Sequence, residues 1–420
     1  MKSYNNQNII TFSNFAKINP FRKIPNGNEV KFVSMEDIDA GRKFVTRYSI
    51  RQFKGGSKFR NGDTLMARIT PSLEHGKTAF VNFLNEGEVG GGSTEFIVLS
   101  NREGVSLSEY VYYLAISSII REPAIKSMSG TSGRQRVDPD IFEQIQVPAP
   151  DLDEQQAIVK ILSDLDEKIE LNNQMNKTLE EIAQAIFKRW FIDFEFPNEN
   201  GEPYKSSGGE MVESELGMIP KGWEVKAIKN IGNVVCGKTP SIKVKENFGF
   251  DFPFITIPDM HGNTFVVKTE RYLSHIGMIS QKNKLIPPFS ICVSCIATPG
   301  LVSITSEYSQ TNQQINSIVC HKNDQIYFTY LNMKIRTDEI KKMGLGGSAT
   351  LNLNTTDFGN IKMVFSDVTI SAFDRIVAPL FLKILANSKE NLNLALVRDL
   401  LLPKLMTGKI RVPLGEQNVQ

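Results

Sequence analysis

The sequence has few cysteines, no long apolar run and almost no net charge. Four cysteines in 420 residues are too few for a disulfide scaffold, and the polar start MKSYNNQNII lacks the basic flank and apolar core of a secretory signal. No apolar run approaches the roughly 20 residues that a membrane span requires. With 41% hydrophobic and 22% charged residues, we expect a soluble, cytoplasmic protein of two or three folded domains with no membrane partner.

The formal net charge of +2 would argue against a polyanion-binding protein only if the charge were evenly spread. Residues 42–68 hold eight basic residues against one acid, and residues 221–284 hold ten against five. Residues 151–186 hold nine acids against three lysines. This segregation predicts two surfaces for an anionic partner and an acidic element between them in the sequence; solvated charged faces are the alternative.

The chain contains an internal repeat. FVSMEDID (32–39) resembles FITIPDMH (254–261), and LMARITPS (65–72) resembles VSCIATPG (293–300). Further on, residues 127–147 align with residues 342–363, which places Gly130, Ser132, Phe142 and Ile145 on Gly346, Ser348, Phe358 and Ile361. Because the order is the same in both halves, the pattern indicates a duplicated domain.

Each half ends in a segment with the alternating three- and four-residue spacing of a coiled-coil seam. The predicted seam residues are Leu162, Leu165, Ile169, Asn172, Asn176, Leu179 and Ile186 in the first segment and, 215 residues further on, Val377, Leu380, Ile384, Asn387, Asn391, Leu394 and Leu401 in the second. Because a seam Asn is satisfied by a partner Asn, we predict antiparallel helices that pair Asn172 with Asn391 and Asn176 with Asn387. Amphipathic helices packed on their own domains are the alternative.

Local signals set the ends of these helices. Asp151 and Glu154 form a helix start, and the first helix is expected to reach about Phe191. Pro379 is expected in the first turn of the second helix or at a kink, and Pro403 at a kink or at the end. The Pro-, Gly- and Ser-rich residues 197–210 predict an exposed linker. Further apolar residues of the first helix either dock another subunit or pack on the adjacent domains: Ile158, Ile161, Met175, Ile182, Phe187 and Phe191.

The chain resembles the specificity (S) subunit of type I restriction-modification systems over nearly its whole length. The resemblance is carried by SMSGTSGRQRVDPDIFEQIQVPAPDLDEQQAIVKIL (127–162), ELGMIPKGWEV (215–225) and LVRDLLLPKLMTGKI (396–410). It implies two α/β (α+β) target recognition domains, related by a pseudo-two-fold axis and separated by two long helices that form an antiparallel coiled coil. Each domain would read one part of a bipartite sequence in double-stranded DNA.

The resemblance also implies the division of the chain and its partners. We expect a first target recognition domain at 1–150, a first long helix at 151–192, a linker at 193–220, a second target recognition domain at 221–366, a second long helix at 367–410 and a C-terminal tail at 411–420. Methylation (M) subunits, expected to number two, would use S-adenosylmethionine, and restriction (R) subunits would use ATP and Mg. The chain itself would bind no cofactor and would not be an enzyme. The first 30 residues lack an opening like Gly222-Trp-Glu224.

Candidate DNA-binding residues are cationic, amide or hydroxyl side chains in polar, Gly-containing segments, since cations and hydroxyls contact phosphates and Arg, Asn and Gln read base edges. The basic segment from Arg42 to Lys58 is expected to be a mobile loop that orders on DNA. Gln313 lies in a polar run that is also typical of a strand edge. The candidates are Arg42, Lys43, Arg47, Arg51, Lys54, Lys58, Arg68, Thr70, Arg134, Gln135, Arg136, Lys238, Thr239, Lys243, Lys245 and Gln313.

Other chemistry is less well supported by the sequence. Gly232 to Thr239 spells G-x-x-x-x-G-K-T, but Pro240 follows and no helical period begins there, which disfavours a phosphate-binding loop. Cys292 and Cys295 lie on an expected strand, where residues three apart point to opposite faces, so no metal site is predicted. The competing hypotheses are a coiled-coil scaffold that binds no specific DNA sequence and a P-loop nucleotide hydrolase.

Overall fold

The computed structural model describes residues 8–413, except residues 132, 297 and 345–352. The chain divides into two compact units. The first unit consists of residues 1–170 and 393–420, and the second of residues 171–392. Each long helix therefore contributes residues to both units. Within the described residues, no helix is both long and apolar enough to cross a membrane.

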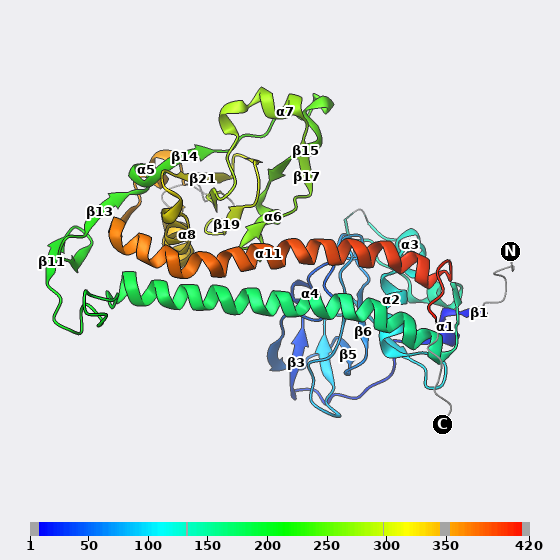
Figure 1. Ribbon diagram of the computed structural model, residues 1–420. Helices are drawn as coiled ribbons and strands as arrows, with labels where there is room; N and C mark the ends of the chain where they lie inside the picture. Colours follow the sequence, from blue (N-terminus) through cyan, green and yellow to red (C-terminus); the bar gives the residue numbers. More distant parts are fainter. Residues whose placement is uncertain (1–7, 132, 297, 345–352, 414–420) are drawn as a thin grey trace. The chain divides into compact units, whose positions relative to one another are not determined.

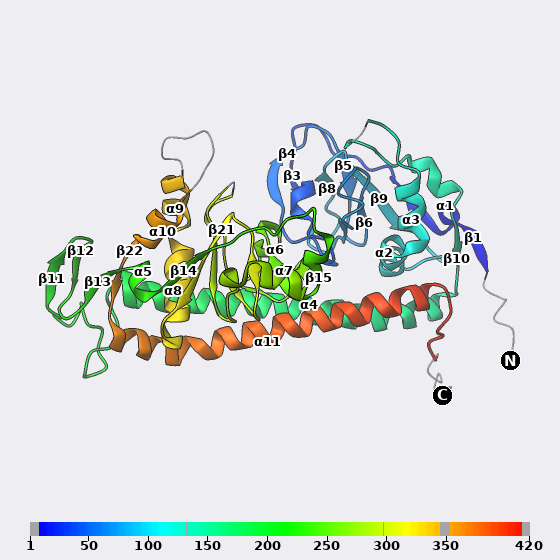
Figure 2. The ribbon, with the colours of Figure 1, turned by 90° about the horizontal axis from the view of Figure 1, so that it is seen from above.

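The first unit contains two four-stranded sheets and a short strand pair (Figure 2). One sheet is antiparallel throughout and has the order β2-β9-β6-β7. In that order its strands are Ala16–Ile18, Phe96–Asn101, Thr64–Ala67 and Thr78–Phe80. The other has the order β4-β3-β8-β5: Ser49–Gln52, Glu29–Val33, Gly90–Gly92 and Ser57–Phe59. β1 (Ile9–Thr11) pairs with β10 (Gln146–Pro148). Helix α2 (Ser108–Ile116) packs on β6 and β9, and α3 (Ser118–Lys126) follows it.

The second unit repeats this plan with additions. Its main sheet has the order β14-β21-β18-β19-β16: Gly232–Cys236, Ile315–Cys320, Ile291–Ser294, Val302–Thr305 and Phe265–Val266. A three-stranded sheet has the order β17-β15-β20: Arg271–Leu273, Phe248–Ile255 and Gln310–Thr311. β13 (Glu224–Ala227) pairs with β22 (Lys362–Phe365). The helices include α7 (His275–Ser280), α8 (Ile326–Ile335), α9 (Thr337–Gly344) and α10 (Thr355–Gly359).

The topology confirms the internal repeat. β3 pairs in parallel with β8 at Phe32, and β15 pairs in parallel with β20 at Phe254, the residue that the sequence alignment places on Phe32. Each strand leads into a short helix with a capping box, formed by Ser34 with Asp37 in the first unit and by Thr256 with Asp259 in the second. Of the other aligned pairs, Phe142 with Phe358 and Ile145 with Ile361 are buried, whereas Ser132, Gly346 and Ser348 lie outside the described residues.

The long helices are α4 (Leu152–Phe187), which continues into a π turn (Lys188–Ile192), and α11 (Asp367–Met406). Pro379 lies well inside α11 and not in its first turn, so the first of the two expected positions is wrong. The helix also continues through Pro403 and ends at Met406, before Gly408, whose φ of 66° closes it. All of the predicted seam residues are buried or half-buried.

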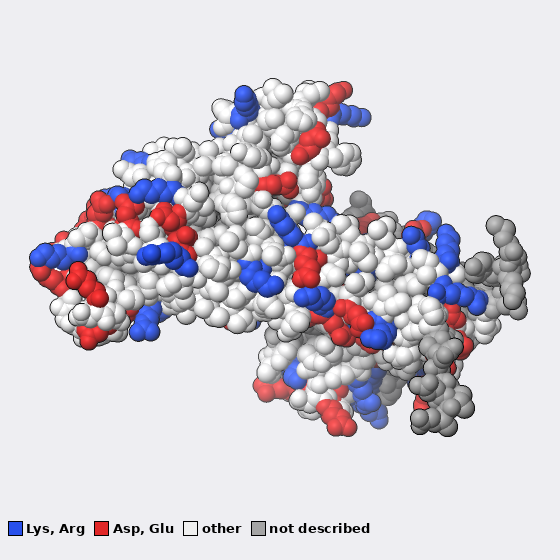
Figure 3. All heavy atoms as spheres, viewed as in Figure 1, with Lys and Arg blue, Asp and Glu red and all other residues white. Residues whose placement is uncertain are grey.

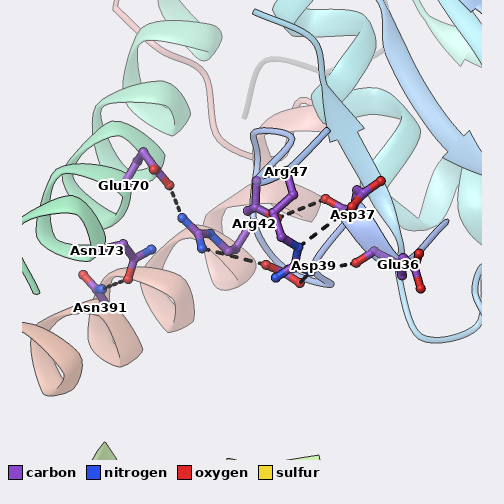
Figure 4. A network of polar contacts seen from close by, with 9 residues as sticks. Glu36, Asp37, Asp39, Arg42, Arg47, Glu170, Asn173 and Asn391 are labelled. Carbon is purple, nitrogen blue, oxygen red and sulfur yellow. Dashed lines mark hydrogen bonds and ion pairs between the residues drawn. The ribbon is translucent and has the colours of Figure 1, made fainter. Parts of the chain in front are cut away.

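Asparagines of α4 and α11 form the polar layers within the second unit. Asn172 donates a 2.9 Å hydrogen bond to Asn391, and Asn387 donates a 2.8 Å bond to Asn176. Both predicted pairs are therefore present, and the helices are antiparallel. The layer is wider than predicted, since Asn391 also donates to Asn173 at 2.9 Å (Figure 4) and Asn172 to Glu390 at 2.9 Å.

In each unit, α4 and α11 lie side by side and belong to the domain core (Figure 1). In the first unit, Leu162 of α4 shares a core with Leu402 and Leu405 of α11. In the second unit, Phe187 of α4 shares a core with Phe373 of α11. Of the apolar residues outside the seam, Ile158, Phe187 and Phe191 are buried, whereas Ile182 is exposed. For the buried three, packing within their own unit is what the structure shows.

Residues 197–210 are mostly exposed, as predicted for the linker, but they form turns that Tyr204 anchors to Phe196 of the second unit. Phe196 is only 8% exposed because its ring stacks on Tyr204 at 4.7 Å and on Trp223 at 4.9 Å. The residues that follow form a hairpin from β11 (Met211–Ser214) and β12 (Gly217–Pro220). The Gly, Pro and Ser content reflects turns, and the aromatic residues among them provide apolar surface that packs on the second unit.

Two carboxylates meet at the start of α11. Burial and, to a smaller extent, the nearby carboxylate of Asp324 together raise the pKa of Asp374 to about 6. Because this pKa is raised on folding, the native state binds more protons than the unfolded state between about pH 4 and 6. Above that range the ionised Asp374 lowers the free energy of unfolding. We expect Asp374→Asn to stabilise the protein by on the order of 1 kcal/mol at pH 8, allowing for solvent screening. The gain should vanish below about pH 4 in urea unfolding experiments; an equal gain at both pH values would contradict this explanation.

Candidate nucleic-acid interface

The basic segment of the first unit is only partly a loop. Residues 49–52 form edge strand β4, which pairs with β3, and residues 57–59 form β5, which pairs with β8. The prediction of a loop is therefore wrong for Arg51 and Lys58, whereas Arg42, Lys43, Arg47 and Lys54 lie outside the strands. The glycines and the basic side chains obscured the alternation of the strands, and backbone pairing with distant segments overrides local composition.

Lys43 lies inside the first unit. Its side chain is 1% exposed and forms an ion pair with Glu109. The ammonium group also lies 5.2 Å from the ring centroids of Phe44 and Tyr113 and 5.6 Å from that of Phe80. In this environment Lys43 cannot reach a phosphate, so its assignment as a DNA-binding residue is not retained.

Arg42 and Arg47 are partly neutralised by neighbouring acids (Figure 4). Arg42 donates to Glu170 of α4 at 2.6 Å, and Arg47 donates to the carbonyl of Glu36 at 2.7 Å and to Asp39 at 3.2 Å. Arg47 is 60% exposed, so this surface pairing is weak. Arg42 is better described as attaching the segment to α4 than as a free phosphate contact.

A cavity of about 390 Å³ in the first unit brings together residues that are distant in the sequence. Lys58 and Arg68, both predicted candidates, line it with Arg22 and the 84% exposed Phe21. Arg22 forms a 2.7 Å ion pair with Asp63, and burial raises the pKa of Asp63 even though Ser100 and Arg22 hydrogen-bond to it. Arg68 donates to the carbonyl of Val137 at 2.9 Å. The cavity is thus a cationic recess whose arginines are held in place by hydrogen bonds.

The segment that contains Arg134, Gln135 and Arg136 borders the sheet. Thr70 accepts a 3.0 Å bond from the backbone of Gln135, and Arg136 forms a 2.7 Å ion pair with Glu95. Hydrogen bonding from Arg136 lowers the pKa of Glu95. Arg134 is exposed, and none of the described residues provides its side chain with a hydrogen bond or an ion pair.

The matching edge of the second unit presents Lys238, Thr239 and Gln313. The Thr239 hydroxyl donates to Gln313 at 2.7 Å, and the backbone of Lys238 donates to the carbonyl of Thr311 at 2.9 Å. Gly237 permits this approach, because a Cβ there would lie 2.1 Å from the carbonyl oxygen of Asn312. Lys238, Lys243 and Lys245 are exposed, and the described residues offer their side chains no hydrogen-bonding or ion-pairing partner.

The G-x-x-x-x-G-K-T match does not have the geometry of a phosphate-binding loop. Gly232–Cys236 is strand β14, and the residues after Thr239 are not helical until a 3-10 turn at Lys245–Asn247. No helix N-terminus therefore follows the match to face a phosphate, and the P-loop hypothesis is not pursued.

The cysteines of the second unit are packed as small apolar residues. Burial raises the pKa of both Cys292 and Cys295 to about 12, which disfavours the thiolate form that metal binding requires. Among the described residues, no group of three His, Cys, Asp or Glu side chains is placed to hold a metal ion.

Two residues that sequence reasoning missed emerge from the repeated topology. α1 (Phe12–Phe15) leads directly into β2 as α5 (Ile228–Ile231) leads into β14. Counting from these junctions places Arg22 and Lys23 on Lys238 and Thr239. Lys23 is exposed, so it joins the candidates. The shared Asn at the third position of each short helix, Asn14 and Asn230, is a weak signal that could have aligned the two openings.

Comparison with known proteins finds relatives over nearly the whole chain. Residues 3–181 and 220–365 match the family described as type I restriction modification DNA specificity domain. The specificity subunit of the type I restriction enzyme HindI from Haemophilus influenzae is 37% identical, over 94% of this chain and 97% of that protein. The MjaIX specificity subunit from Methanocaldococcus jannaschii is 28% identical, over 74% of this chain and 71% of that protein. The crystal structure of a type I S subunit from M. genitalium aligns with a TM-score of 0.50 at 17% identity, over 97% of this chain and 98% of that one, which supports the same fold.

Proposed function

This chain belongs to the specificity (S) subunit family of type I restriction-modification systems, and on that premise we propose that it is the DNA-recognition subunit of such a complex. The domain of each unit reads one half of a bipartite sequence in double-stranded DNA, and α4 and α11 set the distance between the two halves. The chain is proposed to carry out no chemistry of its own.

The observation that supports this proposal best is the repeated topology with cationic residues at matching positions. The β2-β9-β6-β7 order of the first unit recurs as β14-β21-β18-β19 in the second. The Arg22 and Lys23 edge of the first sheet corresponds to the Lys238 and Thr239 edge of the second. Two versions of one framework with different side chains at the same edge suit the recognition of two different half-sites.

We propose methylation subunits, two in number, and restriction subunits as the protein partners, with the complex in the cytoplasm. S-adenosylmethionine would be bound by the methylation subunits, and ATP and Mg by the restriction subunits. Exposed apolar side chains on the helices provide docking surface for the methylation subunits: Leu171, Ile182, Leu382, Leu396, Val397 and Leu400.

The proposed function is tested by selecting bound duplexes from a random DNA library with the chain assembled on its methylation subunits. The expected result is a two-part motif with a fixed gap, and the same motif should surround the methylated adenines in the source genome. Recovery of DNA without any shared sequence would leave a scaffold that is not sequence-specific, and this proposal would fail.

Alanine substitution of one exposed lysine or arginine should change the electrostatic part of binding. We expect Lys54→Ala, Arg134→Ala, Lys238→Ala and Lys243→Ala each to reduce by about 1 the slope of log K against log salt concentration, because each removes one phosphate contact. Lys160→Ala on α4, whose lysine is 72% exposed and paired with Asp164, is the control and should leave the slope unchanged. A candidate whose substitution leaves the slope at the wild-type value does not contact phosphate.

A further inference from the structure

Five exposed apolar side chains of the second unit lie on α7 and on the segment that packs against it. We call them the α7 patch: Ile242, Val244, Phe250, Ile276 and Ile279, which are 70%, 43%, 94%, 58% and 62% exposed. Figure 3 shows this end of the second unit as a mostly uncharged surface bordered by charged side chains. Among the large hydrophobic residues that the structure describes, Phe250 is the most exposed.

The backbone holds Phe250 outward. β15 changes register against β17 between Phe248 and Phe252, which both face Leu273, so the residues between them protrude from the ladder as a bulge. On either side of Phe250, the backbone is fixed to α7. A Cβ on Gly249 would lie 3.0 Å from that of Ser274, and Asp251 accepts a 3.1 Å hydrogen bond from the backbone of His275. The phenyl ring therefore stands on a supported bulge.

The α7 side of the patch is equally well supported. A Cβ on Gly277 would meet the carbonyl oxygen of Asn247 at 2.0 Å, so α7 packs directly on the segment that carries Val244 and Phe250. Ser274 caps the helix by accepting a 3.1 Å bond from the backbone of Gly277, and His275 packs edge-on against Phe252 at 5.1 Å. α7 and the segment that carries Val244 and Phe250 thus support each other.

The charges around the patch suit a polyanion. Lys243 and Lys245 alternate with Ile242 and Val244 along one short segment, and the described residues give these lysines no ion-pair partner. Lys282 is exposed just beyond α7. The exposed acids next to the patch are Glu246 and Asp251, and Asp251 is occupied by the helix start. Lysines beside an exposed aromatic ring are the combination with which proteins contact both the phosphates and the bases of a duplex.

We propose that Phe250 makes an apolar contact with a base pair in the half-site read by the second unit, while Lys243 and Lys245 bind the flanking phosphates. This inference rests on the proposed function and adds a specificity-determining residue to it. The apolar partner of the ring is either a thymine methyl group in the major groove or the faces of an opened base step.

The test measures the affinity of the chain, assembled on its methylation subunits, for a fluorescent duplex that carries the motif of the methylated adenines. Phe250→Ala should weaken binding by about tenfold to a hundredfold, as expected for loss of a buried phenyl contact. It should leave the salt slope unchanged, unlike Lys243→Ala. The matched control is Val368→Ala, which removes a side chain that is 82% exposed at the start of α11 and should have no effect.

Two further duplexes identify the partner of the ring. If it is a thymine methyl, replacing thymine by uracil in that half-site should remove the difference between wild type and Phe250→Ala. If it is a base step, a 2-aminopurine at the step should brighten with wild type and not with Phe250→Ala. A variant that binds within twofold of wild type overturns the inference, as does one that loses its methylation subunits on gel filtration, which would make the patch a protein contact. Absence of selective binding by wild type would overturn the proposed function as well.

Discussion

Replacing Asp166 by alanine should destabilise the first unit by about 3 kcal/mol, because it leaves a buried guanidinium with only the exposed carboxylate of Asp399 as counter-charge. Asp166 of α4 and Arg398 of α11 are 2.6 Å apart, with side chains that are 2% and 6% exposed. The Tyr113 hydroxyl of α2 donates to the same carboxylate at 2.7 Å. Burial and the adjacent Asp166 both raise the pKa of Tyr113, so the hydroxyl stays a donor. One carboxylate therefore joins three helices of the first unit.

The positions of the tryptophans allow the stability of the two units to be measured separately. Trp190 and Trp223 are the two tryptophans of the chain and both belong to the second unit, so their fluorescence reports on that unit. Hydrogen exchange of residues 108–126 reports on α2 and α3 of the first. Asp166→Ala should accelerate exchange in that segment and leave the fluorescence transition of the second unit unchanged. Equal protection of α2 in the variant and the wild type would contradict the assigned role.

Two further variants test whether the loss of stability comes from the ion pair between Asp166 and Arg398. Asp164→Ala removes an acid two residues from Asp166, on the exposed side of α4. Its side chain and that of its 3.0 Å partner Lys160 are 58% and 72% exposed, so the change should alter stability by less than about 1 kcal/mol. The double variant Asp166→Leu with Arg398→Met removes both charges and should recover much of the lost stability, since apolar residues of similar volume can replace a buried ion pair.

The helix pair could be predicted from the sequence because its information is local and periodic. The three- and four-residue spacing defines the seam, and the two asparagines in each seam allow only one antiparallel register in which Asn meets Asn. The structure shows Asn172 bonded to Asn391 and Asn176 to Asn387. Arg398 interrupts the apolar pattern at a seam position, and its partner Asp166 is 232 residues away, so this pair was not predicted.

The DNA-contacting surface could be predicted only in part, because charge in a sequence does not reveal burial. Lys43 belongs to the same basic run as Lys54, yet one is buried against Glu109 and the other is exposed. The Lys43 and Glu109 contact joins residues 66 positions apart, which local composition cannot indicate. Lys23 was missed for the opposite reason, since its equivalence to Thr239 depends on the strand topology and not on similar letters.

Inserting three heptads into both long helices should abolish binding to the native target and restore it on a target with a longer gap. Three heptads are 21 residues, which add about 32 Å at 1.5 Å per residue, and one turn of B-DNA is about 34 to 36 Å over 10 to 10.5 base pairs. The insertion therefore brings a half-site back to nearly the same face of the duplex, with a gap about nine or ten base pairs longer. A single heptad adds only about 10 Å and leaves the half-sites on different faces.

The facing positions for the insertions follow from the observed register. Asn172 meets Asn391 and Asn176 meets Asn387, so a break between Glu170 and Leu171 in α4 faces a break between Leu392 and Asn393 in α11. Both breaks coincide with the boundary between the units, which leaves the polar layer and the Arg42 bond to Glu170 intact. The inserted seam positions should be Leu and Ile without further Asn, so that the register stays defined by the native layer.

Selection from a random duplex library then measures the gap directly. The insertion variant should return the same two half-sites with the longer gap, and its affinity for the native target should fall by more than about a hundredfold, since one half-site is lost. A matched insertion of 21 residues between Glu215 and Leu216, in the hairpin outside the helices, should return the native gap. If the helix variant also returned the native gap, α4 and α11 would not set the spacing, because helices longer by about one turn of DNA cannot hold the two domains at the native distance.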